Sequence, residues 1–295
     1  MNPCLVILDS GAVSFYNKCV KKHSRGAPGR AFKYRTNECH DYTQTQAFLD
    51  YRESYVQYIL KNEKYLTGYI NLDIINNAEA SYEQLKYLES KGCKPMPVYH
   101  LGNDSKWLQR YVDEGYKAIC IGGIVPNRYA SVRPILDELW SNILTDKDGY
   151  PLVKVHGLAV TSFYLLKRYP WWSGDSASWR KAGGYGKIFI PRKKNGKWDF
   201  NRCAVALRCT RTPSLRNYRS FDSINEEGKK WALEWLDYIK VPFGIVGKDD
   251  EMIEWGVVSS HSARSVANLH YHYHLVSSLP KWPWPFKIKR RMKIL

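Results

Sequence analysis

The feature that constrains the fold most is a regular alternation of short apolar runs with amphipathic stretches along the first 175 residues. Apolar runs of four to six residues predict buried strands, and the amphipathic stretches predict helices. The expected strands are residues 4–8, 69–75, 95–99, 117–121, 152–156 and 171–175, and the expected helices are 42–62, 80–90, 105–114, 130–143 and 162–168. We therefore predict an α/β fold with a parallel sheet, and six such units favour a TIM-like (β/α)8 barrel over a doubly wound sheet.

The pattern changes after residue 175. Residues 186–191 and 200–207 alternate on either side of Lys194-Asn195-Gly196-Lys197, which predicts an inserted β-hairpin. Residues 224–240 and 260–277 predict C-terminal helices, and the prolines of 280–285 predict a non-helical tail along the surface. We expect one domain over 1–295, with a basic hairpin at about 183–210 and a basic tail at about 280–295.

The charge of the chain indicates a polyanionic partner. Lysine and arginine outnumber aspartate and glutamate by 45 to 28, a formal net charge of +17, and residues 180–219 hold twelve basic side chains against one acid. Aromatic residues lie between the charges, which suits stacking on nucleic-acid bases. The alternative is a basic, solvated surface without a partner. The candidate nucleic-acid contacts are Arg180, Lys181, Arg192, Lys193, Lys194 and Lys197.

Other classes of protein are excluded by what the chain lacks. No run approaches the roughly 20 apolar residues of a membrane span, so no membrane partner is expected. Residues 1–10 have no basic start and a short apolar run, which is not typical of a signal peptide. The seven scattered cysteines predict reduced thiols and a cytoplasmic protein.

Polar side chains follow the ends of the predicted strands. They are Asp9, Ser10 and Gly11, then Asp73, His100, Gly122 and Gly123, then His156 and Gly157, and finally Asp175. Reactive residues of parallel α/β barrels lie at the carboxyl ends of the strands. A single aspartate there is more often a helix N-cap, but three carboxylates and two histidines on one rim indicate a site.

These pieces resemble, in order, the motifs of tRNA-guanine transglycosylases over roughly residues 5–210. Leu8-Asp9-Ser10-Gly11 is similar to the family's Asp-Ser-Gly-Gly motif, and Asn71-Leu72-Asp73 resembles its base-recognition aspartate. Ile121-Gly122-Gly123-Ile124-Val125 resembles its Gly-Gly-Leu segment, and His156-Gly157-Leu158 stands at its later glycine motif. Asp175 falls where the family keeps its nucleophile.

Departures from the family pattern are also specific. The Cys-x-Cys-x-x-Cys zinc motif is missing, since only Cys203 and Cys209 occur in that region. His270, His272 and His274 alternate in a predicted helix and cannot share one face, so we expect no metal. His100 stands in place of a glutamine. The chain is most similar to the zinc-less bacteriophage DNA 7-deazaguanine transglycosylases, which implies the host cytoplasm.

The resemblance implies a function and a role for each residue. The enzyme would replace guanine in DNA with a free 7-deazaguanine base, 7-cyano-7-deazaguanine being the first candidate, without a cofactor. Asp175 would be the nucleophile of a covalent aspartyl-sugar intermediate and Asp9 the general acid/base, as two carboxylates suit glycosidic chemistry. The base would be bound by Ser10, Gly11, Asp73, His100, Gly122, Gly123, His156 and Gly157. The alternatives are tRNA as substrate, a catalytically inactive nucleic-acid-binding barrel, and a small-molecule nucleosidase.

Overall fold

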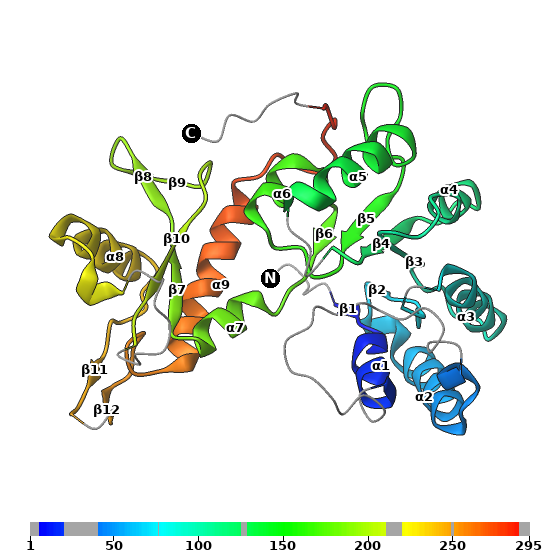
Figure 1. Ribbon diagram of the computed structural model, residues 1–295, viewed down its shortest axis with the longest axis horizontal. Coiled ribbons are helices and arrows are strands. Elements are labelled where there is room, and N and C mark those ends of the chain that lie inside the picture. Colours follow the sequence, from blue (N-terminus) through cyan, green and yellow to red (C-terminus); the bar gives the residue numbers. More distant parts are fainter. Residues whose placement is uncertain are drawn as a thin grey trace. The chain divides into compact units, whose positions relative to one another are not determined.

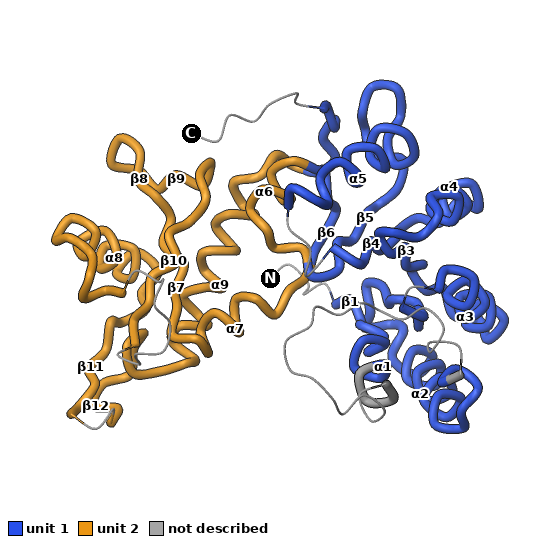
Figure 2. The backbone as a smooth tube through the Cα atoms, in the orientation of Figure 1, with its two compact units in different colours: residues 1–159, 169–174, 282–295 blue, residues 160–168, 175–281 orange. Residues whose placement is uncertain are grey.

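The computed structural model describes residues 6–20, 41–75, 77–124, 129–210, 220–248 and 251–288. The chain divides into two compact units (Figure 2). Unit 1 consists of residues 1–159, 169–174 and 282–295, and unit 2 of residues 160–168 and 175–281.

Unit 1 contains parallel strands in chain order (Figure 1). Strands β3 (Val98–His100), β4 (Ala118–Gly122), β5 (Lys154–Gly157) and β6 (Ser173–Gly174) form a four-stranded parallel sheet. Strand β1 (Ile7–Leu8) pairs in parallel with β2 (Gly68–Tyr69). A parallel bridge between Ile70 and Met96 leads from the end of β2 to the residues before β3. The predicted mixed α/β class with parallel strands is confirmed, and the described strands form no closed barrel.

Helices alternate with these strands, namely α1 (Ala12–Val20), α2 (Gln46–Asn62), α3 (Ala78–Ser90), α4 (Lys106–Asp113) and α5 (Tyr129–Asn142). One apolar core joins α1, α2 and α3 to β2 and the residues after it, with Phe48, Ile59 and Leu72 buried in it. A smaller cluster of Ile70, Met96, Val98 and Cys120 packs with Trp172. Tyr69 belongs to the first cluster and Ile70, the bridge residue after β2, to the second, because successive residues of extended backbone point to opposite faces.

Two predicted boundaries in unit 1 are wrong for local reasons. The helix predicted from residue 42 begins at Gln46, after a 3-10 turn η1 (Asp41–Gln44), because Thr45 Oγ1 caps it by accepting from the Phe48 N–H (3.3 Å). The strand predicted over 69–75 ends at Tyr69, because the next residues turn to α3. There the Ser81 hydroxyl accepts from the Ile74 N–H (2.8 Å) and the Asn71 amide donates to the Ser81 carbonyl (2.8 Å).

Two further differences from the sequence-based prediction lie in unit 1. The strand expected at 171–175 is shorter, Ser173–Gly174, and helix α1 was not predicted. The second 3-10 turn, η2 (Glu63–Tyr65), directly follows α2. The C-terminal segment of unit 1 is not helical, as expected, but it does not only line the surface: Phe286 is buried, and its N–H donates to the Gly149 carbonyl (2.7 Å). The basic residues of the tail after position 288 lie outside the described part of the chain.

Unit 2 contains the predicted hairpin. Strand β7 (Lys187–Ile190) pairs antiparallel with β10 (Val205–Arg208), and β8 (Arg192–Lys194) pairs antiparallel with β9 (Lys197–Asp199). Asn195 and Gly196 connect β8 to β9 with φ values of 50° and 73°, the backbone that an Asn-Gly turn adopts readily. Residues 200–204 are not in a strand, contrary to the prediction for 200–207.

Helices and a second ribbon complete unit 2. The helices are α6 (Phe163–Arg168), α7 (Ser178–Gly184), α8 (Glu226–Tyr238) and α9 (His261–Ser277), with a 3-10 turn η3 (Phe221–Ser223) and the antiparallel pair β11 (Ile245–Val246) and β12 (Met252–Glu254). The sequence predicted α6, α8 and α9 but missed α7. Asn268 of α9 joins α7 to β7, since its amide donates to the carbonyls of Trp179 and Lys187 (3.0 Å each). Among the helices that the structure describes, none combines the length and the apolar composition that a membrane span requires.

Candidate functional site

Five of the predicted site positions follow strand ends on one edge of unit 1. Asp9 directly follows β1, His100 ends β3, Gly122 ends β4 and Gly157 ends β5, while Asp73 lies four residues beyond β2. These strands are parallel to their paired neighbours, so their carboxyl ends lie at the same edge. The rim expected from the sequence is therefore present for the residues of unit 1.

The most closely coupled pair on this rim is Asp73 and His100. His100 Nε2 lies 2.6 Å from Asp73 Oδ2, and the two side chains are only 9% and 6% exposed. An ionised carboxylate only accepts hydrogen bonds, so Nε2 carries the proton when Asp73 is ionised. The pair thus presents a buried acceptor whose orientation is set by the imidazole.

Gly122 sets the place of the His100 ring. A Cβ atom at Gly122 would lie 2.8 Å from His100 Nδ1 and 2.9 Å from Cε1, closer than real Cβ contacts allow. The ring therefore packs directly on the backbone of β4. Gly123 has a φ of 76°, and a Cβ there would lie 3.1 Å from the Leu101 nitrogen. Gly122 is thus favoured by the close approach of the His100 ring, and Gly123 by its positive φ and the close backbone of Leu101.

Asp9 is exposed, whereas Ser10 and Gly11 after it form close contacts in the turn before α1. The Gly11 N–H donates to Asp9 Oδ1 (3.3 Å), and the Ala12 N–H donates to the buried Ser10 hydroxyl (3.4 Å). Gly11 has a φ of 70°, and a Cβ there would lie 2.5 Å from the Tyr51 hydroxyl oxygen. Ser10 and Gly11 thus form the turn into α1 and leave the Asp9 carboxylate available to solvent.

The sequence reasoning missed two tyrosines of α2 that support this rim. The Tyr51 hydroxyl donates to the Ser10 carbonyl and the Tyr55 hydroxyl to the Ile70 carbonyl, each at 2.6 Å. Burial, and next the negative charge of Asp9, raises the pKa of both phenols. Both therefore remain neutral donors. Their spacing of four residues on one amphipathic helix is the signal that the sequence offered.

The side chain of His156, near the carboxyl end of β5, forms a hydrogen bond with the neighbouring strand. The side chain is buried, and Nδ1 lies 2.8 Å from the Ser173 hydroxyl oxygen of β6. This contact joins β5 to β6, where His156 and Ser173 are also paired across the two strands. Gly157, the last residue of β5, follows it toward the rim.

Asp175 belongs to unit 2. It follows β6 directly, and its side chain is exposed. Helix α7 begins three residues later at Ser178, whose N–H donates to the Ser176 hydroxyl (3.0 Å). The predicted nucleophile and the predicted acid/base are thus carried by different units.

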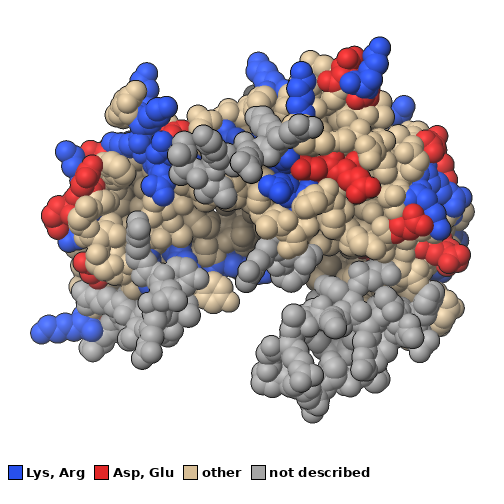
Figure 3. Space-filling model, turned by 45° about the horizontal axis from the view of Figure 1, so that its top comes forward, with Lys and Arg blue, Asp and Glu red and all other residues tan. Residues whose placement is uncertain are grey.

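The predicted nucleic-acid contacts are of two kinds: Lys193 is paired with a carboxylate, and the other five are exposed and have no ion pair among the described residues, so we call them open cations. Arg180 and Lys181 are exposed on α7, and the three hairpin cations, Arg192, Lys194 and Lys197, are exposed on β8 and β9. Figure 3 shows lysine and arginine side chains gathered at this hairpin end of unit 2.

Lys193 differs from its neighbours on the hairpin. Its ammonium forms an ion pair with Glu234 of α8 and lies 4.6 Å from the centre of the Trp198 ring. Trp198 in turn packs edge-on against Trp235. Lys193 therefore holds the hairpin on α8, and its charge is already compensated.

The cysteines and histidines of unit 2 do not gather. Among the described residues no group of three His, Cys, Asp or Glu side chains could hold a metal ion. Cys203 is exposed, whereas Cys209 is buried, and burial raises the pKa of its thiol to about 12. His270 and His274 lie ring to ring at 6.5 Å, while His272 packs on Phe189, so the prediction that the three do not share a face is confirmed.

Comparisons with known proteins identify no relative. The chain matches no protein-family model. No curated protein and no solved structure matches it either.

Proposed function

We propose that this protein is a base-exchange glycosyltransferase that replaces guanine in DNA with a 7-deazaguanine derivative, with 7-cyano-7-deazaguanine as the first candidate. The observation that carries the proposal is the buried pair of Asp73, in the segment after β2, and His100, the last residue of β3, which the parallel bridge of Ile70 and Met96 brings to one edge. It combines with the ordered resemblance of the strand-end motifs to those of tRNA-guanine transglycosylases.

The pair suits recognition of a guanine-like base. A carboxylate offers about four acceptor positions, and His100 uses one of them on Oδ2. The remaining positions can accept from the N1–H and the 2-amino group, two donors that adenine and pyrimidines do not present side by side. The His100 ring and Leu101 fill the space that side chains at Gly122 and Gly123 would take, so this segment would meet a substituent at position 7 through its backbone N–H groups.

The chemistry needs two carboxylates, and the chain supplies Asp9 and Asp175. The Asp175 carboxylate attacks C1′ of the target nucleotide while the C1′–N9 bond breaks and the Asp9 carboxyl protonates the departing guanine. Asp9 then takes the proton from the incoming base, whose nitrogen attacks C1′ and releases Asp175. Two displacements restore the β-linkage.

The fold proposed for this reaction is a TIM-like barrel. Strands β3 to β6 lie in sequential order, and β1, β2 and the Ile70–Met96 bridge extend that order at one side. A doubly wound sheet reverses its strand order at a switch point, and the described strands of unit 1 have no reversal. This sequential order supports the barrel that we propose.

The polymer is proposed to be held by the open cations. A base inside a duplex cannot bring its C1′ to a carboxylate, so the nucleotide must be flipped out and its flanking phosphates gripped. Arg180, Lys181 and the hairpin cations are exposed in the segment that follows Asp175, which suits this task. A tRNA substrate and an inactive nucleic-acid-binding barrel remain the alternatives.

One experiment tests the function and separates the alternatives. The protein is incubated with duplex DNA or tRNA that carries labelled guanine, together with guanine, 7-cyano-7-deazaguanine or no added base. Release of labelled guanine from DNA on addition of the deazaguanine supports the proposal. Release from tRNA alone favours the tRNA enzyme, and binding without release from either favours the inactive barrel.

A further inference from the structure

A cavity of about 640 Å³ lies at the other edge of unit 1, where the strands begin. Its lining comes from the residues that precede or start β2, β3, β4, β5 and β6, together with the end of α3. The lining residues used below are Glu89, Lys94, Met96, Lys117, Lys154 and Trp172. Its volume falls in the range of about 300–1,000 Å³ that is typical of small-molecule sites.

Three lysines from neighbouring strands surround this cavity. Lys94 precedes β3, Lys117 precedes β4 and Lys154 begins β5. All three side chains are exposed, and within the described part of the chain none of their ammonium groups forms an ion pair. Three like charges around one recess repel one another, so an anion bound among them is favoured electrostatically.

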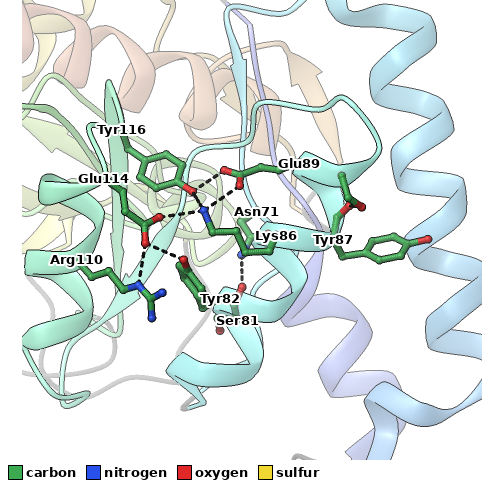
Figure 4. Close-up of polar contacts among 10 residues, drawn as sticks. Asn71, Ser81, Tyr82, Lys86, Tyr87, Glu89, Arg110, Glu114 and Tyr116 are labelled. Atoms are coloured by element: carbon green, nitrogen blue, oxygen red, sulfur yellow. Dashed lines mark hydrogen bonds and ion pairs between the residues drawn. The ribbon is translucent and has the colours of Figure 1, made fainter.

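The one acidic side chain of the lining does not compensate these lysines. Glu89 Oε2 is paired with Lys86 Nζ (3.0 Å), and its Oε1 accepts from the Tyr116 hydroxyl (2.5 Å). Figure 4 shows Glu89 turned to Lys86, which also meets Glu114 (3.0 Å). The carboxylates beside the cavity are thus occupied within the α3–α4 network, and the lysines keep their net charge.

The cavity also has an apolar, aromatic side. Trp172 packs against the cluster that contains Met96, and Lys154 Nζ lies 5.0 Å from the centre of the indole ring. A flat apolar wall next to a group of cations fits a ligand with an aromatic ring at one end and phosphates at the other. Lysine binds phosphate as a point charge, so exposed, flexible ammonium groups suit it.

We propose that this cavity is a binding site for a free nucleotide, with its phosphates among Lys94, Lys117 and Lys154 and its base on Trp172. The site lies at the amino ends of the strands, opposite the rim that carries Asp73 and His100. It is therefore separate from the proposed exchange site. A bound nucleotide would act as an effector or anchor and not as the reacting base.

Equilibrium titration with fluorescent mant-GTP tests the proposal, with unlabelled GTP, guanine, ribose 5-phosphate and inorganic phosphate as competitors. The double variant Lys117→Gln/Lys154→Gln should weaken mant-GTP binding at least about tenfold, since hydrogen bonds to charged groups are among the stronger ones. The matched control is Lys61→Gln/Lys64→Gln, which removes two exposed charges of unit 1, one of them also over an aromatic ring, outside the cavity. The control should bind like the unaltered protein.

The competitors show which part of the nucleotide is recognised, and the variant Asp73→Asn shows whether it binds at the cavity or at the exchange rim. GTP should compete best, ribose 5-phosphate and phosphate more weakly, and guanine not at all, while Asp73→Asn should leave mant-GTP binding unchanged. Absence of mant-GTP binding, or binding equally strong in the cavity double variant, overturns the proposal. So does a loss in Asp73→Asn, which would place the nucleotide at the exchange rim, or displacement by a DNA duplex at lower concentration than by GTP. None of these results depends on base exchange.

Discussion

Asp73 and His100, 27 positions apart in the chain, meet at 2.6 Å in a buried hydrogen bond at the carboxyl edge of the unit 1 sheet. The contact exists because β3 begins beside the end of β2, through the bridge of Ile70 and Met96, and both chains then turn at the same edge. The Gly122 backbone supports the imidazole from behind. This buried pair carries the proposed function, and it supplies the first prediction.

Replacing His100 should change base recognition more than catalytic turnover. His100→Met removes the donor to Asp73 and leaves a buried carboxylate without that partner, at a cost of about 1–3 kcal/mol. The KM for the free deazaguanine base should rise about fivefold or more, with a smaller change in kcat. His100→Gln keeps a side-chain donor and should recover much of the affinity. Steady-state kinetics with equal KM values for both variants and the unaltered protein would contradict this role.

Replacing Asp175 should stop exchange and leave DNA binding intact. An amide cannot form the glycosyl ester, so Asp175→Asn should show no release of labelled guanine, and its affinity for duplex DNA should stay within about twofold because an exposed carboxylate makes no phosphate contact. Denaturing electrophoresis should detect a protein–DNA adduct only with the unaltered aspartate. The control is Asp148→Asn, an exposed loop carboxylate of unit 1. Normal exchange by Asp175→Asn would remove this residue from the mechanism.

The open cations of the hairpin should carry the salt dependence of DNA binding. The triple variant Arg192→Ala/Lys194→Ala/Lys197→Ala should make the slope of log affinity against log salt shallower by up to about three units, at roughly one unit per phosphate contact. The control removes two cations that are already paired, Lys229 of α8 with Glu226 and Lys240, two residues after α8, with Asp237. Fluorescence anisotropy at several salt concentrations measures both. Equal slopes in the triple variant and the control would mean that phosphates are gripped elsewhere.

The network between α3 and α4 should make stability depend on acid pH. Partial burial opposes ionisation of Glu114, but hydrogen bonds from Tyr82, Arg110 and Lys86 outweigh it and lower its pKa from 4.5 to about 2. A carboxyl group with a lowered pKa in the folded state stabilises the fold fully above about pH 4.5, and the contribution is lost as the pH falls toward 2.

Glu114→Gln should therefore lower the free energy of unfolding by about 1 kcal/mol at pH 7, and the difference should shrink between pH 4.5 and pH 2. Denaturant titrations at pH 7, 4 and 3 check the trend. Glu83→Gln, an exposed position of α3 without a recorded ion pair in the described chain, is the control and should show little difference at any pH. If the loss of unfolding free energy in Glu114→Gln instead grows as the pH falls, the network does not stabilise the fold in the way described.

Much of the candidate site in unit 1 could be predicted because it follows from local patterns. Apolar runs that alternate with amphipathic stretches fix the order of strands and helices, and parallel strands place the residues after them on one edge. That is why Asp9, Asp73, His100 and Gly122 were expected on a common rim. The Asn195-Gly196 turn is equally local, since positive φ at two successive positions specifies this kind of hairpin.

The sequence by itself determined the α/β class, the basic hairpin and the residues of the rim, because periodicity, turn chemistry and strand order depend on near neighbours in the chain. Only the tertiary structure decided which side chains contact one another. Side-chain contacts across long separations decided that His100 bonds Asp73, that Lys193 is neutralised by Glu234 and that Tyr51 supports Ser10. They also decided that the three lysines at the amino edge form no ion pair with any residue that the structure describes, since the compensation of a charge depends on which side chains the folded chain brings within a few ångströms of it.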